Sequence, residues 1–265
     1  MVKVSTLLTT YNAEDFLKPT LQSVEDQTFS DMEILVWDDF SQDNTRHMLR
    51  EYKENSSYDV ALHFPDENKG PYVGLNKLLE EASGDYIAIQ DHDDIWHPQK
   101  IEQQVRMLDN HSRFIGCGTG RYVYYEALGK VTEFKRKNVS YYAYHTSSVF
   151  RNAPGIQYDE TVDGSKDMFF QRYVLGKNQR KFLNMEDILA LSRVHDEQTN
   201  LSERWRKHEN FFNVFWKHGF KEAVYSVHSK PLPTSIRNFL TALILRRRQT
   251  KDITELREPW SNYIS

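Results

Sequence analysis

Short apolar runs alternate along the first 110 residues with longer segments whose apolar side chains recur at helical spacing. The apolar runs predict strands at residues 2–9, 32–39, 60–64 and 85–90. The intervening segments FLKPTLQSVEDQ, DNTRHMLREYKEN, VGLNKLLEEAS and PQKIEQQVRMLDN predict amphipathic helices. Because strands that alternate with helices build a parallel sheet covered on both faces, this part is predicted to be α/β and doubly wound.

The pattern changes after residue 112. RFIGCGTGRYVYYE and VTEFKRKN predict a pair of hairpin strands, YAYHTSSVFR and RKFLNMEDILALSRV predict further strands, and KDMFFQRYVLG predicts a short helix. From about residue 201 the chain becomes helical, with basic and aromatic residues mixed. We find no repeat or low-complexity linker, so the boundary near residue 200, which precedes the predicted C-terminal helical extension (203–265), rests on composition only.

The composition of the 265 residues, 39% hydrophobic and 27% charged, is that of a folded globular protein. A formal net charge of -4 argues against nucleic acid as a partner, because binding to the phosphate backbone needs a basic surplus. The single cysteine, Cys117, excludes a disulfide framework and a thiolate metal site and suits a reducing cytosol. A cytoplasmic protein is therefore expected.

The sequence predicts no membrane span. The N-terminal MVKVSTLLTTYN is too short and too polar for a secretory signal, and no segment reaches about 18 uninterrupted apolar residues. RWRKHENFFNVFWKHGFK and FLTALILRRRQ mix basic and apolar residues, as helices at a membrane surface do. Packing against the rest of the chain or a second subunit explains the same apolar residues. Peripheral contact with the inner face of the membrane and a homodimer are therefore two hypotheses.

Polar and acidic side chains follow three of the predicted strands. TTY at 9–11 ends the first strand, the acidic pair at 38–39 ends the second, and DHDD at 91–94 ends the fourth. In open parallel sheets ligands bind outside the carboxyl ends of the strands, so these side chains are predicted to share one edge. A turn explains any one acidic pair alone, since aspartate forms local turns readily. Agreement across three strand ends favours a binding site.

The DHDD segment places three carboxylates in four positions, where like charges repel and raise one another's pKa. A divalent cation among them would offset this cost. Mg²⁺ and Mn²⁺ prefer oxygen ligands and commonly use one or two carboxylates, with water and substrate phosphate completing the shell. An Asp-X-Asp at a strand end therefore indicates a site for a metal-bound diphosphate leaving group.

Five segments occur in an order that is more specific than any one of them: VSTLLTTYNAEDFLKPTLQSVEDQTFSDMEILVWDDFSQDNT, NKGPYVGLNKLLEEASGDYIAIQDHDDIWHPQKI, HTSSVFR, GSKDMFF and SRVHDEQTNLS. Together they resemble the inverting nucleotide-sugar transferases of glycosyltransferase family 2, over about residues 2–202. The resemblance implies the GT-A fold, a Rossmann-like and mostly parallel central sheet with helices on both faces. It also implies a catalytic domain at 1–202, with the nucleotide bound by residues 1–110 and the acceptor by 111–202.

For the nucleotide, the resemblance implies that Thr9 and Tyr11 line the pocket and that Asp39 binds the base, usually uracil. Asn68 and Asn76 match positions near the nucleotide.

For the metal, the resemblance implies Mn²⁺ or Mg²⁺ on the Asp-X-Asp motif, with Asp93 as a direct ligand and Asp91 at the ribose or in an outer-shell contact. Asp94 matches the common D-x-D-D form. His92 stands on the nucleotide-sugar side, where a histidine departs from the usual small residue. His195 in SRVHDEQ is expected near the diphosphate or the metal.

For the catalytic base, the family places an acid at the start of a helix after a glycine turn, which in GSKDMFF is Asp167. This carboxylate would take the proton of the acceptor hydroxyl. The usual acidic pair is here Lys166-Asp167, so Lys166 replaces the first acid. The alternative explanation of Asp167 is structural, because an acid at the N-terminus of a helix interacts favourably with the helix macrodipole. The other candidates for the base are Asp163, Asp159 and Glu160.

Three more residues are expected on the acceptor or phosphate side: Trp96, Lys166 and Arg193. HTSSVF matches the strand beneath the acceptor pocket, and the sequence assigns no role to its His145.

The function that follows is inverting transfer of a sugar from a UDP-sugar to a hydroxyl of a glycan or lipid-linked acceptor. A nucleotidyltransferase is one alternative, although TTYNAED is no glycine-rich phosphate loop. A catalytically inactive sugar-nucleotide-binding protein is the other, because Lys166 stands where the family has an acid.

Overall fold

The computed structural model describes residues 3–135, 139–141, 143–161, 166–175, 181–195 and 250–264. The chain forms two compact units. Unit 1 comprises Met1–Arg121, Phe134–Ser192 and Arg257–Ser265, and unit 2 comprises Tyr122–Glu133 and Arg193–Leu256. Strands β6 (Gly116–Tyr125) and β10 (Phe182–Val194) each run from unit 1 into unit 2.

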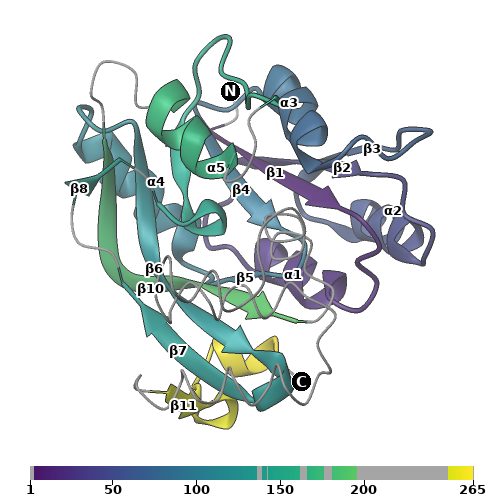
Figure 1. Ribbon diagram of the computed structural model, residues 1–265, viewed down its shortest axis with the longest axis vertical. Coiled ribbons are helices and arrows are strands. Elements are labelled where there is room, and N and C mark those ends of the chain that lie inside the picture. Colours follow the sequence, from purple (N-terminus) through teal and green to yellow (C-terminus); the bar gives the residue numbers. More distant parts are fainter. Residues whose placement is uncertain are drawn as a thin grey trace, which may run out of the picture. The chain divides into compact units, whose positions relative to one another are not determined.

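Unit 1 is built on four parallel strands, β1 (Val4–Thr10), β2 (Met32–Asp38), β3 (Asp59–His63) and β4 (Tyr86–Asp91). Their order in the sheet is β4-β1-β2-β3 (Figure 1). The chain first progresses from β1 to β3 in one direction and then returns to the other side of β1. This reversal makes the gap between the ends of β1 and β4 a topological switch point, where ligands bind in such sheets.

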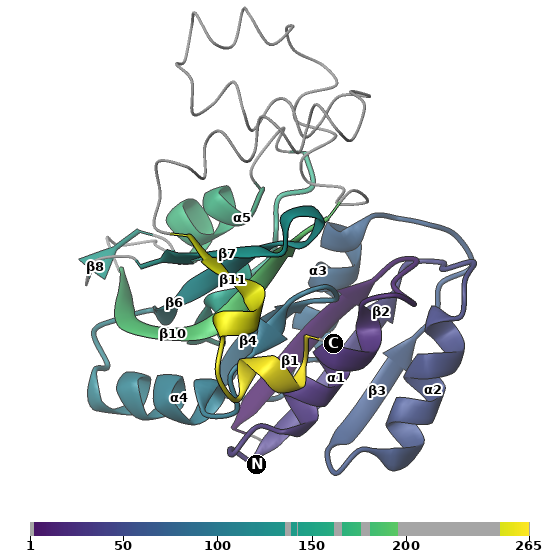
Figure 2. The same ribbon diagram turned by 90° about the horizontal axis from the view of Figure 1, so that it is seen from below.

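Two apolar layers cover the sheet, as the alternation of side chains along each strand requires. One layer packs α1 (Leu17–Glu25), α2 (Thr45–Asn55) and α4 (Lys100–Asn110) on one face. The other packs α3 (Pro71–Glu81) and the helical segment formed by α5 (Lys166–Phe169) and the π-helical turn Phe170–Leu175 on the opposite face (Figure 2). The predicted doubly wound α/β half is therefore confirmed.

The second half of unit 1 extends the sheet with antiparallel strands. β9 (Val149–Arg151) pairs with β4 and with β6, while β10 pairs with β5 (Ile95–Trp96) and β8 (Val139–Ser140). Glycine lets β10 lie close to β6: a Cβ on Gly118 would lie 2.3 Å from Oδ1 of Asn184. The mixed, partly antiparallel extension that the sequence predicts is thus present.

The described part of unit 2 contains a short antiparallel pair, β7 (Lys130–Phe134) and β11 (Thr250–Asp252). Lys130 and Lys251 form salt bridges of 2.9 Å with Asp252 and Glu133 across this pair. A 3-10 turn, Ile253–Glu255, follows and is capped by Asp252.

The C-terminal residues differ from the helical extension that the sequence predicts. Residues 250–264 form β11 and two 3-10 turns, the second at Trp260–Asn262, and the predicted helices at 203–249 lie outside the described residues. Pro259 supplies no backbone N–H, which disfavours a continuous helix there. Trp260 packs near His97, and the Tyr263 hydroxyl donates to Asp26 at 2.7 Å, both within unit 1.

Loss of liposome binding after deletion of residues 236–265 would be one test of the membrane hypothesis, but this packing limits it. Deleting residues 236–265 would remove the buried Trp260 and Tyr263 and would therefore also destabilise unit 1. In the described ranges, no helix combines the length and apolar character needed to cross a bilayer.

Candidate active site

The three predicted strand ends meet at one edge of the sheet. Thr9 of β1 is in register with Trp37 of β2 and with Asp91 of β4, and Thr10 is in register with Asp38. The hydrogen-bonded ladder therefore places the hydroxyls and the acids of the TTY, DD and DHDD segments beside the switch point, as the sequence predicts.

Asp38 has a structural role. Its carboxylate is fully buried and accepts hydrogen bonds from Thr10 Oγ1 at 3.1 Å, from the backbone N and the hydroxyl of Ser41, and from Nε of Arg46. These contacts compensate the buried charge and join the loop after β2 to α2. Of the acidic pair at 38–39, the first acid therefore belongs to the framework.

The ion pair with Arg46 predicts a measurable stability effect. Arg46→Met removes the cation and leaves a buried carboxylate, so the free energy of unfolding should fall by about 3 kcal/mol in urea titrations followed by circular dichroism. Arg50→Met is the matched control, because Arg50 is exposed and also stacks on Phe64, and its effect should stay within about 0.5 kcal/mol. Equal losses in both variants would contradict the assignment of Asp38.

Asp39 fixes the loop before α3. Its carboxylate accepts from the backbone N of Lys69 at 2.8 Å, the backbone N of Gly70 at 2.7 Å and the indole of Trp37 at 3.2 Å. Asn68 donates from its side chain to the Asp39 carbonyl at 3.0 Å. A carboxylate has about four acceptor positions, so these three bonds leave room for one more donor. The predicted bond to a nucleobase is compatible with this geometry and stays a prediction.

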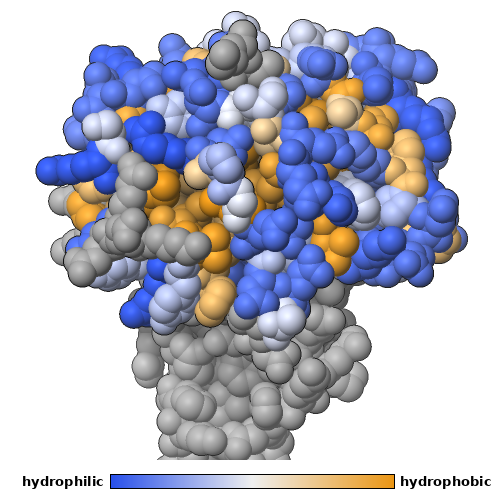
Figure 3. Space-filling view, turned by 90° about the horizontal axis from the view of Figure 1, so that it is seen from above, coloured by the Kyte–Doolittle hydropathy of each residue, from blue (hydrophilic) through white to orange (hydrophobic). Residues whose placement is uncertain are grey.

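The rim beside Asp39 is aromatic and locally strained. Tyr11 is 45% exposed and directly follows β1, and Phe40 is 37% exposed and follows Asp39 after the end of β2. Phe40 has φ of 70° and the neighbouring Asn12 has φ of 45°, a region that bulky residues rarely adopt. Such strain clusters at functional sites. Figure 3 shows apolar surface on this molecule in separate patches between hydrophilic residues.

Asn76 connects α3 to the segment after β9. Its amide nitrogen donates to the carbonyl of Tyr158 at 3.1 Å and to Glu160 at 2.8 Å, and its oxygen accepts from the backbone N of Tyr158 at 2.7 Å. Both amide hydrogens are therefore used within the protein. Direct contact with a nucleotide, as predicted for Asn76, would go through its oxygen.

Hydrogen bonds from neighbouring strands hold the last residue of the DHDD segment, Asp94. Gln90 donates to the carbonyl of Asp94 at 2.8 Å, and Ser192 donates to its carboxyl group at 2.9 Å. Burial raises the pKa of Asp94 well above its ordinary value, and the negative charges of Asp93 and Asp91 raise it further. The repulsion expected from the sequence is thus present in the folded protein.

This donor set fits a hard divalent cation. Asp91 has a partly exposed carboxylate and Asp93 a buried one, two positions apart at the end of β4. Within the described residues, no three histidine, cysteine or acidic side chains gather closely enough to hold a metal alone. An ion bound by two carboxylates would take its other ligands from water and a diphosphate, which is the usual coordination of Mg²⁺.

One imidazole joins the DHDD acids to the predicted base. Nδ1 of His145 lies 3.4 Å from Oδ1 of Asp91, and its Nε2 lies 3.6 Å from Oδ1 of Asp167. Nε2 also lies 3.0 Å from the Tyr158 hydroxyl. Burial lowers the pKa of His145, but the charges of Asp167 and Asp91 outweigh it and raise this pKa to about 9. The sequence analysis assigned no role to His145, because its partners are 54 and 22 residues away.

The acceptor-side predictions have mixed outcomes. Trp96 is fully buried, donates its indole N–H to the Thr146 carbonyl at 2.9 Å and packs on Lys100 at 3.9 Å. A side chain with no exposed surface cannot touch an acceptor, so Trp96 belongs to the core, contrary to the prediction. Lys166 donates to the Glu160 carbonyl at 2.7 Å and lies over the Tyr72 ring.

Arg193 and His195 belong to unit 2. Arg193 is buried and lies 3.4 Å from Glu126 of the same unit, while His195 is half-buried. Their expected roles at the diphosphate stay predictions.

The backbone carbonyl of His92 accepts a hydrogen bond from the Thr20 hydroxyl at 2.9 Å, which anchors the DHDD loop to α1. Asp163 lies outside the described residues, and Asp159 and Glu160 are exposed.

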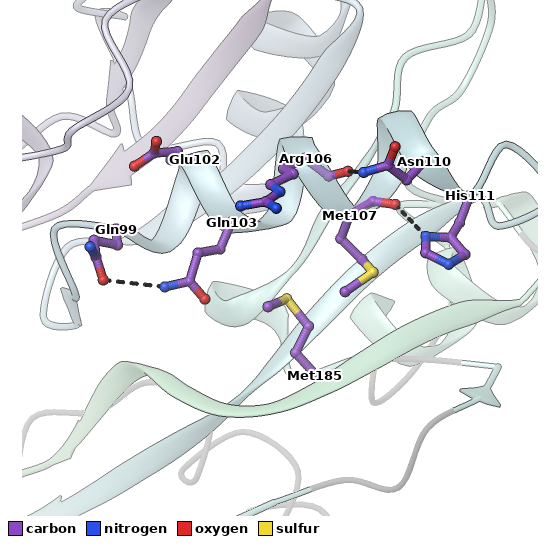
Figure 4. A pocket seen from close by; sticks show the side chains of 8 residues that line it. All are labelled: Gln99, Glu102, Gln103, Arg106, Met107, Asn110, His111 and Met185. Carbon is purple, nitrogen blue, oxygen red and sulfur yellow. Dashed lines mark hydrogen bonds between the residues drawn. The ribbon is translucent and has the colours of Figure 1, made fainter.

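A groove lies alongside α4 (Figure 4). Met107 of α4 and Met185 of β10 face each other there, with glutamines, Arg106 and His111 around them. None of the residues that line this groove is a predicted site residue.

The parallel sheet, its antiparallel extension and the acids at the switch point define a GT-A fold. Among solved structures, the chain resembles Staphylococcus aureus TarS 1-349 in complex with UDP-GlcNAc, with a TM-score of 0.63 and 16% identity over 92% of this chain and 72% of TarS. It also resembles the mannosyltransferase PcManGT of Pyrobaculum calidifontis in complex with GDP-Man and Mn2+, with a TM-score of 0.62 and 16% identity over 92% of this chain and 69% of PcManGT.

The chain belongs to glycosyl transferase family 2, whose family model matches residues 5–160. A curated relative, the UDP-Glc:alpha-D-GlcNAc-diphosphoundecaprenol beta-1,3-glucosyltransferase WfgD of Escherichia coli, is 38% identical over 105 residues, which are 40% of each chain. The aligned part spans between 40% and 45% of the first curated relatives.

Proposed function

We propose that this protein transfers a sugar from a UDP-sugar to a hydroxyl of a glycan or lipid-linked acceptor, with inversion and with Mn²⁺ or Mg²⁺ as cofactor. The observation that carries the proposal is the pairing of Asp91 and Asp167 across one imidazole, at 3.4 and 3.6 Å. The acid of the Asp-X-Asp motif and the candidate base thus face the same space. Inverting transfer needs this juxtaposition, since the base must act where the donor's sugar lies.

In the proposed reaction, Asp167 takes the proton of the acceptor hydroxyl, and the oxygen of that hydroxyl attacks the anomeric carbon of the donor sugar. A carbon–oxygen bond forms on one face of the sugar, and the bond to the diphosphate breaks on the other. The diphosphate leaves with the bonding electrons, and Asp167 keeps the proton. Bound at Asp93 and Asp91, Mn²⁺ or Mg²⁺ would neutralise the charge that develops on the leaving diphosphate.

The donor is proposed to lie along the strand ends. Thr9, Tyr11 and Asp39 follow or end neighbouring strands in register, which suits a nucleoside held by an aromatic rim and a carboxylate. The names of TarS in complex with UDP-GlcNAc and of the UDP-glucose-dependent WfgD support uridine, whereas PcManGT was solved with GDP-Man.

A donor panel tests this function. Purified protein with Mn²⁺ is mixed with UDP-glucose, UDP-GlcNAc, UDP-galactose or GDP-mannose, and thermal stability is measured. The correct donor at 100-fold excess over its Kd should stabilise the protein by about 2.7 kcal/mol, and EDTA should remove this gain. Release of nucleoside diphosphate is then followed with free sugars and with undecaprenyl-diphosphate-linked sugars as acceptors.

The outcomes separate the parts of the proposal. Proton NMR of the product gives the anomeric configuration, and retention would contradict inversion. Stabilisation by GDP-mannose alone would overturn the proposal that the donor carries uridine. Diphosphate released from UTP would indicate a nucleotidyltransferase, and donor binding without turnover across all acceptors would indicate an inactive binding protein.

A further inference from the structure

We propose that His145 is a positioning residue that holds the carboxylate of Asp167 in line with the donor by bridging it to Asp91. The inference rests on the proposed function, because it assigns a partner to the proposed base. It stands on the geometry of three side chains from different parts of the chain: the end of β4, the 3-10 turn His145–Ser147 and the start of α5.

Asp167 needs such a partner. Its Oδ1 is buried and forms no hydrogen bond with the described residues. A buried carboxylate oxygen without a hydrogen bond is costly, and contact with an imidazole nitrogen lowers that cost. His145 Nε2, 3.6 Å away, is in position to do this.

The imidazole is itself held from several sides. The Tyr158 hydroxyl lies 3.0 Å from Nε2, and the Tyr158 ring stacks on Phe170 with centroids 3.9 Å apart. The side chain of Asn76 forms hydrogen bonds with both the backbone N–H and the backbone carbonyl of Tyr158. The ring of His145 therefore has one well-defined orientation, with one nitrogen toward each acid.

The turn beneath the ring is anchored as well. Gln104 donates to the carbonyls of Cys117 and Ser147, each at 2.8 Å, and Trp96 donates to the carbonyl of Thr146. This support explains why Trp96 is buried beside the site without reaching it. Because a rigid second contact fixes a catalytic carboxylate better than packing alone, the bridge would set the angle at which Asp167 meets the acceptor.

Amide replacements separate the two nitrogens of the bridge. His145→Gln places an amide N–H near the position of Nε2 and keeps the contact toward Asp167, whereas His145→Asn places one near Nδ1 and keeps the contact toward Asp91. His145→Ala removes both. We expect kcat for transfer to fall about 100-fold in the alanine variant, because misplacing a reacting group by about 1 Å costs roughly that much. The glutamine variant should recover more of kcat than the asparagine variant, and the donor KM should change less than threefold in all three.

A double-mutant comparison shows whether His145 acts through the base. In the Asp167→Asn background, His145→Ala should lower kcat by less than twofold further, since the group that it positions is already absent. Tyr86→Phe is the control for lost stability: it removes the hydroxyl that bonds with Asp109 and Arg151 at the start of β4, the end opposite Asp91, so it should lower Tm and leave kcat unchanged. Equal kcat in His145→Ala and wild type, or full additivity with Asp167→Asn, would overturn the proposal.

Crystal structures give a readout that does not depend on activity. In His145→Gln the side chain of Asp167 should keep its wild-type rotamer, and in His145→Ala it should turn away or become multiply ordered. An unchanged Asp167 in His145→Ala would contradict the inference even if no donor is found. An inactive wild type with a rotated Asp167 in the variant would instead count against the proposed function alone.

Discussion

Asp167→Asn is expected to lower kcat for sugar transfer by about 10²–10⁴-fold, the range that general bases contribute. The amide has nearly the shape of the carboxylate but cannot accept the proton of the acceptor hydroxyl. Binding of the donor should be almost unchanged, because the amide keeps the shape of the side chain and the nucleoside is proposed to lie against Thr9, Tyr11 and Asp39. Steady-state kinetics and calorimetric titration with the donor would measure both quantities.

Asp159→Asn provides the comparison. Asp159 is exposed, accepts hydrogen bonds from Thr161 and is one of the alternative bases among the described residues, eight residues before Asp167. Its replacement should leave kcat within about twofold, because an exposed surface change rarely alters a site. Loss of activity in Asp159→Asn with retention in Asp167→Asn would move the base to the earlier acid.

Asp93→Asn is expected to reduce kcat/KM by about 10²–10³-fold, the loss typical of one charge-stabilising group in a buried site. The variant should also need a higher Mn²⁺ concentration for half-maximal rate, since a neutral amide binds a hard cation more weakly than a carboxylate does. Titrating the rate with Mn²⁺ measures this shift. Unchanged turnover with unchanged metal dependence would show that Asp93 is not a ligand.

Asp85→Asn is the matched control for Asp93. Asp85 precedes the same strand β4 at its opposite end, where it is exposed and pairs with Lys3 at 3.4 Å. Its replacement removes one negative charge from the protein without changing the charge at the switch point. A comparable loss in Asp85→Asn would mean that net charge, and not ligation, explains the Asp93 result.

The local pattern of the chain was sufficient for much of the fold. Apolar runs and helical periodicity predicted β1, β2, β4 and the helices between them, because each such segment must bury one stripe or face. The positions of the acids after these runs predicted the shared edge, since parallel strands place their carboxyl ends together. Residues 250–264 were predicted less well, because a short strand and 3-10 turns depend on pairing and on single capping contacts.

The candidate site was predictable only in part. The resemblance pointed to Asp39, Asp91, Asp93 and Asp167, but the sequence assigned no role to Asp38. In the structure Nε of Arg46 binds Asp38, which makes that acid structural, while the backbone of Lys69 and Gly70 binds Asp39. The prediction for Trp96 was wrong because the burial of this side chain depends on distant residues, in β10 and in the turn at Thr146.

The sequence by itself determined the α/β class, the order of strands and helices in the first half, the acid-rich edge and the resemblance to glycosyltransferase family 2. These properties follow from local periodicity and from motifs that are contiguous in the chain. Only the tertiary structure decided that Asp38 is structural, that Asn76 forms hydrogen bonds with Tyr158, and that His145 lies between Asp91 and Asp167. Such contacts join residues far apart in the sequence, and their energies depend on burial and orientation, which exist only once the chain has folded.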